Sequence, residues 1–144
     1  MNLPSKIVIG SDHAGFEYKE AIKQYLAKNN IETIDVGTHS TESCDYPDYA
    51  HAAAREIESG SVEVGILICG SANGVAITAN KHQKIRAALC WQNEIASLAR
   101  QHNDANIICL PARFVTIDEA EEMVHTFITT DFEGDARNGS TPDI

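Results

Sequence analysis

The sequence predicts an α/β domain, a three-layer Rossmann-like fold built on a five-stranded parallel sheet. Short runs of branched apolar residues alternate with longer segments whose apolar residues recur every three or four positions, as strands and helices do in turn. The intervening segments are long enough for right-handed crossovers, which place helices on both faces of a sheet. The length of 144 residues suits one domain over residues 1–144, with a polar tail over 131–144.

Five segments are predicted to be strands because they are short and rich in β-branched residues, as expected of strands that are buried on both faces. The most hydrophobic of them is the third, which ends at Cys69. The predicted strands span residues 6–11, 31–36, 64–69, 85–90 and 106–110.

The helices are predicted from apolar residues that share one helical face. The segment 16–29 has such a face, formed by Tyr18, Ile22, Tyr25 and Leu26, and its lysines, Lys19, Lys23 and Lys28, fall outside that face. The next three helices are expected to run from Pro47 to about residue 60, from the turn 70–74 to about residue 80, and over 94–102. The last helix begins at Thr116 or Asp118 and presents apolar residues at spacings of three and four: Ile117, Ala120, Val124, Phe127 and Ile128.

The charge and the cysteines exclude several classes of protein. The formal net charge is −10, which argues against a nucleic-acid partner and against an anionic membrane surface. Most of this acidity lies in residues 118–144, whereas residues 80–113 carry five basic residues against two acidic ones and suit an anionic ligand. The four cysteines contain no CxxC pair, which favours free thiols in a reducing cytoplasm over a zinc site or a disulfide scaffold.

In a parallel α/β sheet ligands bind outside the carboxyl ends of the strands, so the residues that follow each strand are the candidates for a site. The first strand is followed by Ser-Asp-His-Ala-Gly at 11–15, where a dinucleotide fold would have GxGxxG. Asp12 and His13 could meet substrate hydroxyls, or Asp12 could simply cap the next helix. After the second strand, Tyr46 could cover a ligand with its ring, whereas His39 is expected in a solvated loop.

The third strand is followed by the most informative segment, Cys-Gly-Ser-Ala-Asn-Gly at 69–74. A turn of small residues at the start of a helix directs several backbone N–H groups at one point, which can hold a phosphate or a developing oxyanion. Cys69 would have its thiolate stabilised by the same N–H groups and by the helix dipole. The alternative is a core cysteine followed by an ordinary turn.

Polar residues also flank the fifth strand. His102, beside Asn103, could serve as an acid–base group, or this segment could only cap its helix. Arg113 follows the strand and could bind a phosphate or form a surface salt bridge. After the fourth strand, Cys90 and Trp91 are both predicted to be packing residues.

Together these segments resemble the type B ribose-5-phosphate isomerases and related sugar-phosphate isomerases, over nearly the whole chain. The resemblance rests on six motifs in order, at residues 11–16, 45–47, 69–74, 79–81, 85–87 and 100–104. It implies an aldose–ketose isomerase that works through a cis-enediolate without metal or organic cofactor. It also implies a homodimer or homotetramer whose sites, shared between subunits, bind a small sugar phosphate.

The resemblance further implies roles for individual residues. Cys69 would be the base, because Val75 stands where one branch of the family has a glutamate. His102 would open the sugar ring. The anion hole for the enediolate would be formed by Gly70, Ser71, Ala72, Asn73 and Gly74. Substrate contacts would come from Asp12, His13, Tyr46, Asn103 and Arg113.

The chain departs from the family at two places. Ala72 replaces a glycine of the turn, and Ala136 and Ser140 stand where the family has phosphate-binding arginines, so that Arg137 could substitute after a one-residue shift. The resemblance implies ribose 5-phosphate and ribulose 5-phosphate as the substrate pair, whereas the departures keep other substrates open. The alternatives are a six-carbon sugar phosphate, such as allose or galactose 6-phosphate, and a non-catalytic sugar-phosphate binding protein.

Overall fold

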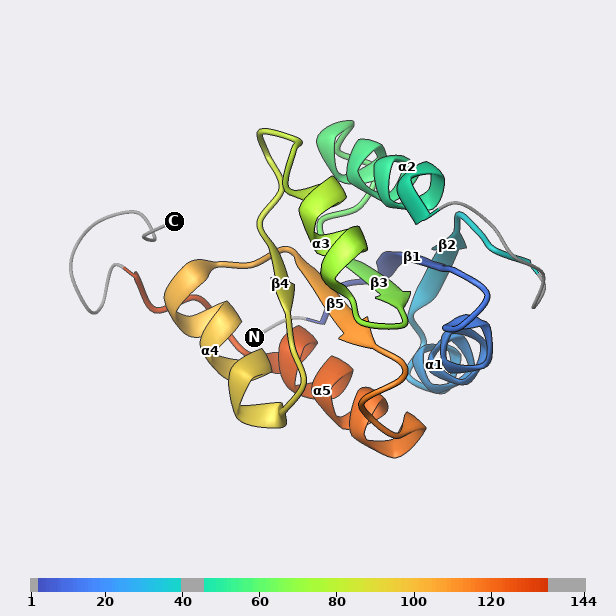
Figure 1. Ribbon diagram of the computed structural model, residues 1–144. Coiled ribbons are helices and arrows are strands. Elements are labelled where there is room, and N and C mark those ends of the chain that lie inside the picture. Colours follow the sequence, from blue (N-terminus) through green and yellow to red (C-terminus); the bar gives the residue numbers. More distant parts are fainter. Residues whose placement is uncertain (1–2, 40–45, 135–144) are drawn as a thin grey trace.

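The computed structural model describes residues 3–39 and 46–134, in which strands and helices alternate around one parallel sheet (Figure 1). The strands are β1 (Lys6–Ser11), β2 (Glu32–Asp35), β3 (Gly65–Cys69), β4 (Ala87–Leu89) and β5 (Ile107–Pro111). The helices are α1 (Phe16–Lys28), α2 (Tyr46–Glu58), α3 (Asn73–Ala79), α4 (Asn93–Asn103) and α5 (Ile117–Thr129). The predicted α/β class is confirmed.

The strand order is β2-β1-β3-β5-β4, and every neighbouring pair is parallel. The chain moves outward from β1 to β2 and then returns to the other side of β1, so the order reverses between β1 and β3. Ser11, at the end of β1, lies opposite Ile68, the residue before Cys69. A reversal of this kind opens a crevice at the carboxyl ends of the two strands, where ligands bind in folds of this class.

Two apolar layers cover the sheet, because alternate residues of each strand point to opposite faces. Ile9, Ile68 and Leu110 pack with residues of α1, α4 and α5 on one face. Val8, Leu67 and Cys109 pack with residues of α2 and α3 on the other face. Figure 1 shows the same division, with α2 and α3 on one side of the sheet and α1 and α5 on the other.

The edge strand β4 is shorter than the predicted segment 85–90. The N–H of Arg86 donates to Oδ1 of Asn106, at 2.9 Å, in place of a ladder bond. Asn80 then pairs with Ala87 through its side-chain amide, accepting the Ala87 N–H at 2.8 Å and donating to the Ala87 carbonyl at 2.9 Å. The Asn106 side chain therefore takes the place of a β5 backbone partner at Arg86, the Asn80 side chain bonds the Ala87 backbone, and regular pairing with β5 starts at Ala87.

Two predictions about burial were wrong. Lys19, expected outside the apolar face of its helix, is 0% exposed, because the Asp35 carboxylate at the end of β2 and the carbonyl of Thr38 accept hydrogen bonds from its Nζ. Trp91, expected to be a packing residue, is 50% exposed, because it follows the edge strand β4 and belongs to neither apolar layer. Cys90 itself is buried, as predicted.

The start of the last helix is also settled. Thr116 is the N-cap of α5: its hydroxyl accepts the Glu119 N–H at 3.1 Å, and the Glu119 carboxylate accepts the Thr116 N–H at 2.7 Å. This reciprocal pair satisfies two N–H groups that have no partner within the helix. Among the described residues, no helix combines the length and the apolar character that crossing a bilayer requires.

Candidate active site

The loop after β1 and the turn after β3 meet at the reversal in strand order. The Asp12 N–H donates to the Ile68 carbonyl at 3.1 Å, which fixes the loop beside Cys69. Oδ1 of Asp12 accepts the N–H of Gly15, the N-cap of α1, at 2.9 Å, so Asp12 supports the helix start without being the cap itself. His13 is exposed beside it.

Gly15 allows this close approach. A Cβ atom on Gly15 would come within 2.6 Å of Cγ2 of Ile68, a separation that real side chains do not tolerate. The start of α1 can therefore lie directly against β3, and Asp12 is brought to the Cys69 end of the sheet.

The turn after β3 has the predicted form. Ala72 is the N-cap of α3 and adopts the left-handed conformation, with φ 67° and ψ −6°. The Asn73 N–H donates to Oγ of Ser71 at 3.3 Å, while the carbonyls of Cys69 and Gly70 accept the N–H groups of Ala112 and Arg113. The left-handed residue reverses the chain, which explains why a glycine would also suit this position.

The backbone N–H groups of Val75, Ala72 and Ser71 act to lower the pKa of the Cys69 thiol, as predicted for a cysteine at the mouth of such a turn. The net shift is nevertheless upward, so the pKa of the Cys69 thiol is raised. Burial, which leaves Cys69 only 6% exposed, has the largest effect and raises the pKa, and the nearby Asp12 charge raises it further. The N–H groups oppose this shift but do not outweigh the loss of hydration.

The other described cysteines behave as core residues. Cys90 and Cys109 are buried free thiols. Burial raises the pKa of Cys90 to about 12. It raises the pKa of Cys109 well above its usual value. Among the described cysteines, only Cys69 has its pKa lowered in part by the backbone N–H groups of a turn at the end of a strand.

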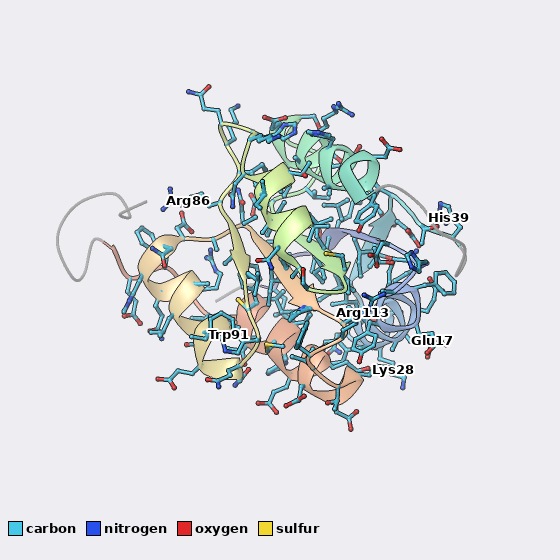
Figure 2. All side chains as sticks on the ribbon, viewed as in Figure 1. Glu17, Lys28, His39, Arg86, Trp91 and Arg113 are labelled. Atoms are coloured by element: carbon cyan, nitrogen blue, oxygen red, sulfur yellow. The ribbon has the colours of Figure 1, made fainter. Side chains whose placement is uncertain are left out.

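Arg113 lies across the same turn. A Cβ atom on Gly70 would contact the Cδ and Nε atoms of Arg113 at 3.3 Å, so the arginine stem covers the glycine. None of the described carboxylates lies within salt-bridge distance of this guanidinium, which is exposed. Figure 2 shows Arg113 near the carboxyl ends of β3 and β5, where it can meet an anionic ligand.

His102 and Asn103 do not join this group within one chain. They form the last turn of α4, which leads into the amino end of β5, whereas Cys69 ends β3. Gly65 and Cys69 pair with the first and last residues of β5, so the five-residue length of the sheet, about 3.3 Å per residue, separates the two ends. His102 is half-buried and Asn103 is exposed at that far end.

Some predicted residues lie outside the described structure. Tyr46 begins α2, but the structure does not describe its side chain. Arg137 lies within residues 135–144, which are also outside the described part. In the described ranges, no group of three histidine, cysteine or acidic side chains is arranged to hold a metal ion.

Two residues of this region were missed in the sequence. Tyr49 is buried on α2, and its hydroxyl reaches the Ile68 carbonyl at 3.4 Å, one residue before Cys69. The buried Lys19 holds the turn after β2 through Thr38, whose N–H bonds to the Ser11 carbonyl next to Asp12. Nothing in the sequence around Tyr49 signals that its hydroxyl meets the end of β3.

The comparison with protein families agrees with this architecture. A family model described as ribose/galactose isomerase matches residues 7–142. The chain belongs to this family. It is 42% identical over 129 residues to ribose-5-phosphate isomerase B of Escherichia coli, and the match covers 90% of this chain and 87% of that protein.

Solved structures of family members have the same fold. A ribose 5-phosphate isomerase from Thermotoga maritima superposes with a TM-score of 0.88 and is 49% identical, over 90% of each chain. Ribose-5-phosphate isomerase B from Mycoplasma genitalium, solved with bound ribulose-5-phosphate, has a TM-score of 0.86 and is 40% identical, over 90% of this chain and 86% of that one.

Proposed function

We propose that this chain interconverts ribose 5-phosphate and ribulose 5-phosphate, with Cys69 as the base. The observation that carries the proposal is a buried thiol at the end of β3, directly before the turn of small residues and beside the Asp12 loop, at the reversal in strand order. Membership of the ribose/galactose isomerase family supports the reaction class. Bound ribulose-5-phosphate in the Mycoplasma genitalium relative supports the substrate.

The chemistry requires a base that moves a proton between C2 of the aldose and C1 of the ketose. The Cys69 thiolate removes the proton and returns it to the neighbouring carbon, while the substrate passes through a cis-enediolate. Because its pKa is raised, the thiolate is the stronger base once it forms, although a smaller fraction is ionised at neutral pH.

The negative charge that develops on the enediolate oxygen needs hydrogen-bond donors that are already in place. The backbone of residues 70–74 and the hydroxyl of Ser71 are suited to this, because the turn is held by β5 through Ala112 and Arg113. Asp12 and His13 are proposed to contact the sugar hydroxyls. Arg113, which covers Gly70, is proposed to contact the phosphate.

Ring opening is assigned to His102, with Asn103 as a substrate contact. Both lie at the amino end of the sheet, so in this mechanism they act on substrate bound at Cys69 of a second copy. We therefore propose a homo-oligomer, at least a dimer, whose sites each take residues from two chains. Tyr46 and Arg137 remain proposed substrate contacts.

The test is the incorporation of solvent deuterium into ribose 5-phosphate at C2 and into ribulose 5-phosphate at C1. The wild-type protein is expected to label both compounds, and Cys69→Ala is expected to label them at least about a hundredfold more slowly. Cys90→Ala is the matched control, because Cys90 is equally buried but lies outside the turn, and it should retain labelling.

Three results would contradict the proposal in different ways. Unchanged labelling by Cys69→Ala would overturn the assignment of the base alone. Faster labelling of allose or galactose 6-phosphate would move the substrate to the six-carbon class. Binding of sugar phosphates without labelling of any of them would make the chain a non-catalytic binding protein.

A further inference from the structure

Arg86 belongs to a sequence motif, residues 85–87, that the mechanism above leaves unused. Its Nε atom donates a hydrogen bond of 2.6 Å to the backbone carbonyl of Asn103. Asn103 is the last residue of α4 and follows His102. Figure 2 shows Arg86 on the opposite side of the view from Arg113, near the end of α4 that leads into β5.

The backbone that carries Arg86 is held firmly. Its N–H donates to Oδ1 of Asn106 at 2.9 Å, and its carbonyl accepts the Asn106 N–H at 2.9 Å. The Asn106 amide also donates to the Lys84 carbonyl at 3.0 Å. Since Asn106 leads directly into β5, the Arg86 side chain projects from a segment that is fixed to the sheet.

The last carbonyl groups of α4 need hydrogen-bond donors from elsewhere, because no N–H group within a helix bonds to the carbonyls of its last turn. The chain leaves the helix at Asp104, which is left-handed with φ 48°, and whose carboxylate bonds to Nη1 of Arg100 at 2.9 Å. Arg100 also donates to the Ala105 carbonyl at 2.6 Å. Two guanidinium groups therefore hold this turn, one from the segment before β4 and one from α4 itself, at the helix end where positive charge is favourable.

The imidazole of His102 forms no hydrogen bond with any other group in the described part of the chain. No hydrogen bond from the described residues therefore holds the ring, and its position depends on the backbone of the turn that carries it. Because Asn103 is exposed, water could replace the guanidinium at its carbonyl with little effect on folding, but water would not fix the orientation of the turn.

We propose that Arg86 is a positioning residue for His102 and Asn103, and that it acts through the backbone of their turn. This inference rests on the proposed function, in which His102 opens the sugar ring. Ribose 5-phosphate forms a furanose that must open, whereas ribulose 5-phosphate stays open because its C5 oxygen carries the phosphate. A residue that acts through His102 should therefore affect the two sugars differently.

The experiment compares Arg86→Met with Arg86→Lys in two assays. For Arg86→Met, kcat on ribose 5-phosphate is expected to fall roughly tenfold, because small misplacements of an acid–base group lower its contribution. Deuterium labelling of ribulose 5-phosphate at C1 should change less than about twofold, since no ring is opened. Arg86→Lys should restore most of the loss, because an ammonium can also donate to the Asn103 carbonyl.

Lys84→Met is the matched control, because it removes a positive charge from the same segment without removing a bond to α4, and it should leave both assays unchanged. Arg86→Met combined with His102→Gln should be no slower on ribose 5-phosphate than His102→Gln alone. Additive losses, equal losses on both sugars, or the same loss in Lys84→Met would overturn the proposal.

A structural measurement separates this inference from the proposed function. In NMR spectra of the full chain, Arg86→Met should shift the ring resonances of His102 and the amide of Asn103, and Arg86→Lys should restore them. If the wild type labels no sugar phosphate but these shifts occur, the proposed function fails and the positioning role stands. If the resonances do not move, the positioning role fails whatever the activity.

Discussion

At the residue scale, the thiol of Cys69 is subject to opposing influences. Burial raises its pKa, three backbone N–H groups lower it, and the charge of Asp12 raises it again. Asp12 itself is also a proposed substrate contact. Substrate that engages Asp12 would therefore act on the ionisation of the base, which links binding to proton transfer at a single strand end.

Replacing Asp12 by asparagine should lower the pKa of Cys69, because removal of a neighbouring anion favours the thiolate. The measurement is the rate of alkylation by iodoacetamide as a function of pH, with the rate of Cys69→Ser subtracted as background from the other cysteines. The midpoint should move to lower pH in Asp12→Asn. Asp118→Asn, which removes an exposed charge on α5, is the control, and a midpoint that stays in place or rises in Asp12→Asn would contradict the account.

At the element scale, one buried ammonium joins α1 to the end of β2. Nζ of Lys19 bonds to both Asp35 oxygens, at 2.8 and 2.7 Å, and to the Thr38 carbonyl. Burial of Asp35 acts to raise its pKa, but hydrogen bonds from Lys19, Lys23 and the Gly37 N–H outweigh it, and the net pKa is lowered. The carboxylate is thus held ionised beside the turn that bonds to Ser11.

Replacing Lys19 by methionine should lower the free energy of unfolding by roughly 3 kcal/mol, because it leaves a largely buried carboxylate without its main partner. Lys23→Met is the matched control: Lys23 bonds the same Asp35 oxygen at 2.8 Å, but its side chain is 30% exposed, so the loss should be below about 1 kcal/mol. Urea denaturation measures both values. Equal losses would show that burial does not distinguish the two ion pairs.

At the scale of the whole molecule, the sheet separates the two groups of candidate residues. Cys69 and Asp12 lie at its carboxyl end, and His102 and Asn103 lie at its amino end. The mechanism proposed above therefore needs two chains for each site. A site shared between two chains can be tested by combining two impaired variants, independently of the rate of either variant alone.

Cys69→Ala and His102→Gln chains, each impaired alone, should regain activity when they are co-expressed. Random pairing gives mixed dimers in half of the population, each with one intact site of two, so activity should reach about a quarter of the wild-type value. The control pairs Cys69→Ala with a chain carrying both substitutions, which leaves no intact site in any combination. If the first pair is as inactive as the control, the shared site is disproved.

Much of the architecture could be predicted from local pattern alone. Apolar periodicity identified the strands and helices, and the strand-end rule selected the segments 11–15 and 69–74, which the structure brings together. These features follow from backbone chemistry and spacing, which neighbouring residues determine. The start of β4 was less predictable, because the N–H of Arg86 bonds to the side chain of Asn106, which lies 20 residues further along the chain.

The sequence by itself determined the fold class, the turn of small residues and the presence of Cys69 at its mouth, since each depends on residues close together in the chain. Only the tertiary structure decided that Lys19 is buried, that the pKa of Cys69 is raised, and that His102 and Cys69 lie at opposite ends of the sheet. The physical reason is that burial and charge act through space: they depend on Asp35, on Asp12 and on which end of the sheet a helix reaches, and none of these is encoded in local periodicity.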